Sequence, residues 1–63
     1  MTLEEARSNI GESVVYSVYY LDGAKKSEPG VITSVSEHFV FVRYGNDKHS
    51  KATLAQMLTL QGR

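Results

Sequence analysis

The two histidines are the side chains of this sequence best suited to acid–base or metal chemistry, because imidazole titrates near neutral pH and binds metals. His38 and His49 stand in different polar segments, without the i, i+4 helical spacing of a two-histidine metal motif. Asp47 lies two residues before His49, which makes a weak chelate at best. Around neither histidine do a hydroxyl nucleophile and a carboxylate form a recognisable triad. We therefore expect solvated turn histidines, with no catalytic residue and no metal site.

The glycines and the missing cysteines remove further kinds of chemistry. The five glycines form neither of the phosphate-binding patterns G-x-x-x-x-G-K-[ST] and G-x-G-x-x-G. The absence of cysteine excludes a disulfide scaffold, a thiolate zinc site, an iron–sulfur cluster and a cysteine nucleophile. The sequence thus predicts no cofactor, no small-molecule substrate and no enzymatic activity.

Charge is balanced over the whole chain but unevenly distributed along it. The chain contains seven Lys and Arg residues and an equal number of Asp and Glu residues, seven. Residues 1–23 carry four carboxylates and one arginine, whereas residues 24–63 carry six cations and three carboxylates. A nucleic-acid contact could therefore form around a local basic patch of Arg43, Lys48, His49 and Lys51, with neighbouring aromatics for stacking. Nucleic-acid-binding domains usually show a clear basic excess, so an ordinary solvated surface is the favoured interpretation.

Aromatic and β-branched residues suggest a second kind of surface. Side chains alternate between the two faces of a strand, so only one face of each strand can point into a core. If residues 14, 16 and 18 and residues 40, 42 and 44 point inward, four apolar side chains point outward: Val15, Tyr19, Phe39 and Phe41. These four form either a protein contact surface, including a homodimer contact, or a surface covered in part by an N-terminal helix.

The elements that would position these residues begin with a short helix, expected over about residues 3–10. Thr2 and Glu5 form a capping box, and Gly11 suits a left-handed helix end. A marginal two-turn helix must dock on something, through Leu3, Ala6 and Ile10.

The rest of the chain has the period-two pattern and the turn residues of short strands. We expect strands over residues 13–21, 31–36, 39–44, 50–52 and 58–60, with a polar loop over 22–30. Thr53 is expected to cap one helical turn over residues 54–57, just before the last strand. The expected core is Val14, Tyr16, Val18, Ile32, Val35, Val40, Val42, Leu54, Met57 and Leu58.

These features together predict one small, mainly β domain spanning residues 1–63, with a five-stranded barrel over about residues 11–60. Four segments carry a resemblance to a known fold: Gly11-Glu12-Ser13-Val14-Val15-Tyr16, then Pro29-Gly30-Val31-Ile32, then Phe39 to Tyr44, then Ala52-Thr53-Leu54 through Leu58. The pattern resembles SH3-like barrels of the KOW/Tudor-like kind, and the size resembles small uncharacterised bacteriophage and prophage proteins. The resemblance implies a barrel that binds protein or nucleic acid, and it carries over no catalytic residue. The chain has no Trp and lacks the acidic loop of proline-peptide-binding SH3 domains.

The sequence therefore favours a non-enzymatic protein-interaction module that binds a protein partner or itself through its outward aromatic face. The alternative is a small nucleic-acid-binding barrel that uses the local basic patch. The chain has no basic, apolar leader and no apolar run long enough to cross a membrane, so we expect a cytoplasmic protein.

Overall fold

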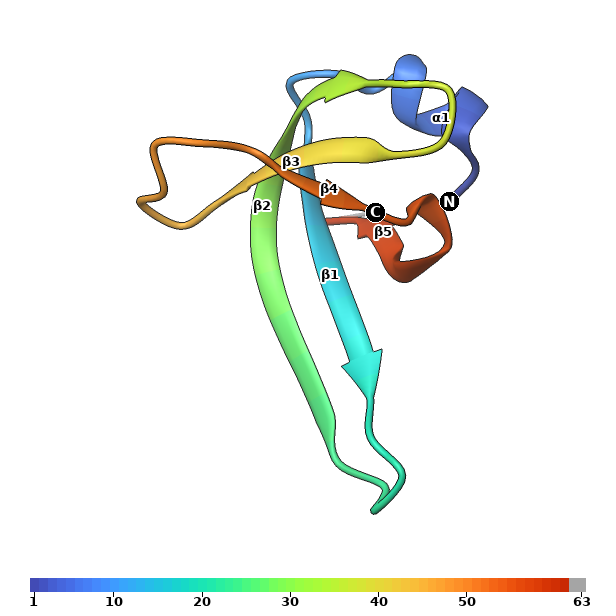
Figure 1. Cartoon of the computed structure of the whole chain (residues 1–63), viewed down its shortest axis with the longest axis vertical. Helices are drawn as coiled ribbons and strands as arrows, with labels where there is room; N and C mark the ends of the chain where they lie inside the picture. Colours follow the sequence, from blue (N-terminus) through green and yellow to red (C-terminus); the bar gives the residue numbers. More distant parts are fainter. Residues whose placement is uncertain (62–63) are drawn as a thin grey trace.

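A single antiparallel sheet of five strands organises the chain in the computed structural model, which describes residues 1–61 (Figure 1). The elements are α1 (Leu3–Arg7), β1 (Ser13–Tyr19), β2 (Lys25–Val35), β3 (Val40–Tyr44), β4 (Lys51–Thr53), the 3-10 turn η1 (Ala55–Met57) and β5 (Leu58–Leu60). The strand order is β4-β3-β2-β1-β5. The mainly β class, the N-terminal helix and the helical turn before the last strand are thus confirmed. Within residues 1–61 no ladder joins the edge strands β4 and β5, so closure into a barrel stays a prediction.

The helix α1 has the predicted start but an earlier end. The Thr2 amide donates to the Glu5 carboxylate at 3.2 Å, and the Glu5 amide donates to the Thr2 hydroxyl at 3.1 Å, which confirms the capping box. The helix stops at Arg7 because the Asn9 side chain donates to the Glu5 carbonyl at 2.7 Å, in place of a continued helical bond. Ala6 is fully buried, but the expected docking role of Ile10 is wrong, since that side chain is 53% exposed.

The first hairpin is much longer than its sequence pattern predicts. β2 begins at Lys25, so the predicted polar loop over residues 22–30 is wrong for most of its length. The connection is a tight turn in which the Tyr20 amide donates to the Ala24 carbonyl at 2.8 Å and Gly23 has a φ of +89°. Lys25 to Ser27 are exposed because this part of the hairpin projects from the body into solvent (Figure 1). With water on both faces, no alternation of polar and apolar residues marks the strand.

A bulge and a glycine let β2 bend over the core. The β2–β3 register shifts between Ile32 and Ser34, which leaves Thr33 as the extra residue. The Thr33 hydroxyl donates to the Phe41 carbonyl at 3.0 Å and lies 2.6 Å from the Ser50 hydroxyl. The bulge explains why Ile32 and Val35 both lie against the core, which strict alternation forbids.

The hydrophobic core lies between the inner face of the sheet, α1 and η1. Its buried members are Ala6, Val14, Ile32, Val40, Val42, Tyr44, Ala55 and Leu58. The predicted inward faces of β1 and β3 are therefore correct at Val14 and at the three alternate residues of β3. Of the other predicted core residues, Tyr16, Val18, Val35 and Met57 are half-buried.

Two predictions at the start of η1 are wrong. Leu54 is 42% exposed, because the chain turns outward between β4 and η1. Thr53 makes no N-cap: it ends β4, and its hydroxyl lies 2.8 Å from the Tyr44 hydroxyl. Thr53, which the local sequence assigns to a helix cap, is instead hydrogen-bonded to the buried Tyr44.

The N-terminus closes the open end of the core. The Met1 ammonium donates to the carbonyls of Ala55 and Leu58, at 3.1 and 2.8 Å, and so ties the start of α1 to η1. Among residues 1–61, neither helical element has the length and apolarity needed to cross a bilayer.

Candidate functional site

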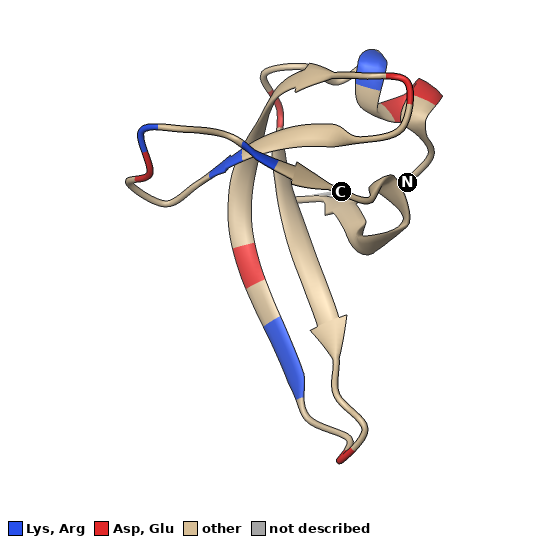
Figure 2. Ribbon diagram, in the orientation of Figure 1, with Lys and Arg blue, Asp and Glu red and all other residues tan. Residues whose placement is uncertain are grey.

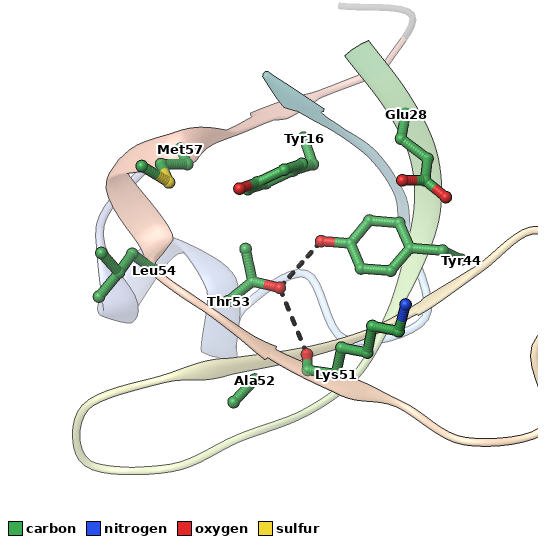
Figure 3. A pocket seen from close by; sticks show the side chains of 8 residues that line it. All are labelled: Tyr16, Glu28, Tyr44, Lys51, Ala52, Thr53, Leu54 and Met57. Atoms are coloured by element: carbon green, nitrogen blue, oxygen red, sulfur yellow. Dashed lines mark hydrogen bonds between the residues drawn. The ribbon is translucent and has the colours of Figure 1, made fainter. Parts of the chain in front are cut away.

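The side chains of β1, β2, β3, β4 and η1 surround a cleft of about 340 Å³ on the concave side of the sheet (Figure 3). The rings of Tyr16 and Tyr44 meet edge to face, with centroids 6.0 Å apart and planes inclined at 68°. Glu28 and Lys51 bring opposite charges to the rim, and Met57 supplies an apolar wall. The cleft thus combines two aromatic rings with one acidic and one basic side chain.

The hydrogen bonds within the cleft stabilise the fold, and one of them joins β3 to β4. The hydroxyls of Tyr44 and Thr53 lie 2.8 Å apart in a buried position, and Thr53 donates to the Lys51 carbonyl at 3.3 Å (Figure 3). Burial raises the pKa of the Tyr44 phenol; the Thr53 hydrogen bond opposes this, and the charges of Tyr16 and Glu28 add to it. A neutral phenol bonded to a threonine hydroxyl is a satisfied core group and a poor base near neutral pH. We therefore assign this pair to the packing of β3 against β4.

The histidines lie apart from the cleft and from each other. His38 is exposed in the turn between β2 and β3, and His49 is exposed in the turn between β3 and β4. In the part of the chain that the structure describes, no three His, Cys, Asp or Glu side chains form a group able to hold a metal ion.

The predicted basic patch is divided between two faces of the sheet. Lys51 of β4 pairs with Val42 of β3, so the two side chains lie on the same face of the sheet. Arg43 follows Val42 in β3, so its side chain lies on the other face. Lys51 also lies 3.8 Å from Asp47, although both side chains are exposed and the pair adds little stability. Lys48 and His49 are exposed in the turn. The blue segments in Figure 2 accordingly occur as separate small groups, with red segments beside them on the long hairpin and in the β3–β4 turn.

The four predicted contact residues are also dispersed. Tyr19 pairs with Lys25 at one end of β2, whereas Phe41 pairs with Ser34 near its other end. Nine residues of strand separate these pairs, or about 30 Å at 3.3 Å per residue. Phe41 and Val15 are half-buried, and Phe39, just before β3, is 41% exposed. They do not form one continuous patch with Tyr19.

A different group of exposed apolar side chains lies at the end of the β1–β2 hairpin. We call residues 17–27 the arm, because there β1 and β2 pair with each other beyond the rest of the sheet (Figure 1). Its tip is formed by Tyr19, Tyr20 and Leu21, which are 72%, 51% and 110% exposed. Of these three, sequence reasoning selected Tyr19 alone.

The signal for the tip is the dipeptide Asp22-Gly23, a frequent hairpin turn that follows directly after the three apolar residues. The Asp22 carboxylate accepts from the Ala24 amide at 2.9 Å and so fixes the turn. A tight turn at that point leaves the preceding apolar residues at the end of a two-stranded arm, with no layer to cover them.

A groove of about 620 Å³ lies at the base of the arm. The groove is lined on one side by Val18, from the inner face of β1, and by Ser17 and Tyr19, from its outer face. Met57 of η1 lies on the other side. The groove therefore runs along the edge of β1, between the arm and η1. Neither a protein-family model nor a curated protein nor a solved structure matches this chain.

Proposed function

We propose that this protein is a non-enzymatic interaction module that binds protein through the tip of its arm. The observation that carries the proposal is the exposure of three consecutive apolar residues, Tyr19, Tyr20 and Leu21, at the end of a projecting hairpin. Contiguous apolar side chains on a small soluble domain mark contact surfaces, and tyrosine is one of the residues most enriched at binding hot spots. The expected outer face of Val15, Tyr19, Phe39 and Phe41 is thereby replaced by a surface centred on Tyr19.

Charge distribution favours protein over nucleic acid as the partner. Arg43 and Lys51 point to opposite faces of the sheet, and Asp47 lies beside Lys51. Binding to a phosphate backbone requires several protein cations on one surface, which release the counterions of the nucleic acid. Lys25 and Lys26 lie on the arm, away from this group.

We further propose that the scaffold is an SH3-like barrel in which β4 and β5 approach each other across η1. The three-residue 3-10 turn that joins them, with Ala55 buried in the core, supports this arrangement. Nuclear Overhauser contacts between β4 and β5 would test it, and an absence of such contacts in well-resolved spectra would argue for an open sheet.

The binding proposal is tested by affinity capture with the tip variant Tyr20→Ser/Leu21→Ser, from a bacterial lysate that also contains untagged copies of the chain. The matched control is Ile10→Ser/Leu54→Ser, because these apolar residues are also exposed but lie elsewhere. We expect wild type and control to retain the same protein, and the tip variant to retain at least about tenfold less of it, a loss of roughly 1.4 kcal/mol.

Two outcomes would contradict the proposal. One is equal capture by the tip variant and wild type. The other is salt-sensitive DNA or RNA binding that is abolished by Lys48→Ala/Lys51→Ala and unaffected by the tip variant, which would support the basic patch instead.

A further inference from the structure

Within the described residues 1–61, no strand pairs with the outer edge of β1 along the arm, and we call this the open edge. β1 continues to Tyr19, but its pairing with β5 ends at Tyr16 opposite Leu58. The Gln61 amide donates to the Ser13 carbonyl at 3.0 Å across this edge. Backbone groups alternate in direction along a strand, so the N–H and C=O groups of Ser17 and Tyr19 also point toward this edge. β1 therefore presents the hydrogen-bonding pattern that another strand would pair with.

The opposite edge of the arm is protected. Ile32 exchanges hydrogen bonds with the segment before β1, so by alternation the backbone of Pro29 faces away from β1. Proline has no N–H to offer there, just beyond the point where the β2–β3 pairing ends at Gly30. Lys26 adds charge, which discourages pairing of exposed strand edges. The arm thus combines one open edge with one blocked edge.

The open edge, the groove and the tip are self-complementary. The groove along the open edge has apolar walls at Val18 and Met57, and the tip offers apolar side chains at Tyr20 and Leu21. The tip also carries the Asp22 carboxylate, while the groove carries the Lys25 ammonium, which lies 5.6 Å from the centre of the Tyr19 ring. The chain has zero net charge, so two copies do not repel each other at long range.

We propose that the occupant of this edge is a second copy of the chain, which forms a two-fold symmetric dimer through antiparallel pairing of the two β1 edges. The tip of each copy then lies on the groove of the other. Such a contact is closed, because each copy contributes the same surface and both β1 edges are then paired. The inference rests on the proposed function of the tip and names the partner that the tip binds.

The expected dimer is weak. A standard stable interface buries about 800 Å² per partner, and an arm of this size provides less, so we expect a Kd on the order of 10–100 µM. Sedimentation equilibrium of the full chain from about 5 to about 500 µM covers this range and should show a rise from monomer to dimer mass.

Proline substitutions at the two edges provide a matched pair of variants. Ser17→Pro removes an N–H from the open edge, whereas Ser27→Pro removes one from the opposite edge; Ser17 and Ser27 face each other across the same hairpin. We expect Ser27→Pro to dimerise like wild type and Ser17→Pro to dimerise at least about tenfold more weakly. Circular dichroism of both variants checks that they fold.

A dilution series of amide spectra of the wild type gives a second measurement that needs no variant. The amides of Ser17 and Tyr19 should shift with concentration, and that of Ser27 should not. A monomer at all concentrations, concentration-independent amides, or equal weakening by the two proline variants would overturn the dimer. If the wild type is monomeric and the tip variant still loses a captured protein, the dimer is wrong and the proposed function stands. Normal capture by the tip variant would instead refute the proposed function.

Discussion

Substitution of Gly30 by alanine tests the packing that lets β2 cross the core. Gly30 is buried in the middle of β2, between Val14 and Tyr44 on the neighbouring strands. A methyl group at this position would stand 2.5 Å from Val42 Cγ1, 2.9 Å from Tyr44 Cδ1 and 3.0 Å from the Arg43 carbonyl oxygen. The two distances to carbon atoms are far shorter than the 3.5–4.0 Å at which carbon atoms attract each other, and the contact with the carbonyl oxygen is also tight.

The loss of stability in Gly30→Ala depends on whether the neighbouring atoms can move away from the new methyl group. Val42 is fully buried in the core, and the Arg43 carbonyl belongs to the backbone of β3, so neither can yield without a shift of the strand. Overpacking of this kind costs about 1–3 kcal/mol, and the rigid neighbours favour the upper half of that range. A domain of this size relies on roughly 3–5 kcal/mol in total. A loss of about 2 kcal/mol should lower the Tm by roughly 8–16 °C.

A double-mutant cycle identifies the clashing atom. Val42→Ala deletes the nearest methyl group and alone should cost roughly 1–3 kcal/mol through a partly unrelaxed cavity. In Gly30→Ala/Val42→Ala the new methyl group partly fills that cavity, so the double variant should be more stable than the sum of the single losses by about 0.5–1.5 kcal/mol. Urea unfolding followed by circular dichroism measures all four proteins, with the exposed Ser27→Ala as a control expected within about 0.5 kcal/mol of wild type.

The reasoning would be refuted in two ways. A Gly30→Ala midpoint equal to that of wild type would mean that β2 and β3 separate without cost. Strict additivity in the cycle would mean that Val42 is not the neighbour that resists the methyl group.

Three further outcomes are expected. Gly45 has a φ of +50°, so Gly45→Val should cost about 1–2 kcal/mol or more, while Lys48→Ala in the same turn should cost under about 0.5 kcal/mol; equal midpoints for the two would indicate a loose loop. Tyr44→Phe should cost about 1 kcal/mol in urea unfolding, since it removes the hydrogen bond to Thr53, and a neutral result would show that the bond contributes nothing. Burial raises the pKa of Tyr44, so folding favours the neutral phenol; the free energy of unfolding should fall as pH rises above about 10, and less steeply in Tyr44→Phe.

The sequence predicted well those elements whose signals are local or whose two faces differ. The Thr2 and Glu5 capping box forms because both partners lie within one turn. The inward residues of β3 were correct because Val40, Val42 and Tyr44 alternate with residues directed away from the core. In both cases the interaction that decides the structure is visible within a few residues of sequence.

The misplaced residues depend on partners distant in the chain. Threonine is a common helix cap, but the buried Tyr44 hydroxyl needs a hydrogen-bond partner, and Thr53 is that partner. Gly30 suggests a turn after Pro29, yet it serves a close approach of strands that only the register reveals. The strand from Lys25 to Ser27 escaped detection because its environment is water on both faces, which leaves no periodicity to read.

The candidate contact surface shows the same limit. The residues Val15, Tyr19, Phe39 and Phe41 share an outward direction, but alternation gives the face of a residue and not its position along the sheet. The register places Tyr19 and Phe41 near opposite ends of β2. The tip became visible only when the turn at Asp22 and Gly23 fixed the length of the arm.

The arm is held by local interactions although it buries little area. A two-stranded hairpin alone is marginally stable in water, yet several local interactions hold this one extended. The Tyr20 amide bonds the Ala24 carbonyl, Asp22 caps the turn, and Lys25 lies over the ring of Tyr19. Each of these orders the tip without burying it, so they add nothing to the core. They do lower the conformational entropy that the tip loses on binding, because a pre-ordered contact surface has less freedom to give up. This combination of local hydrogen bonding and missing burial is the physical reason for our proposal that the arm acts in recognition.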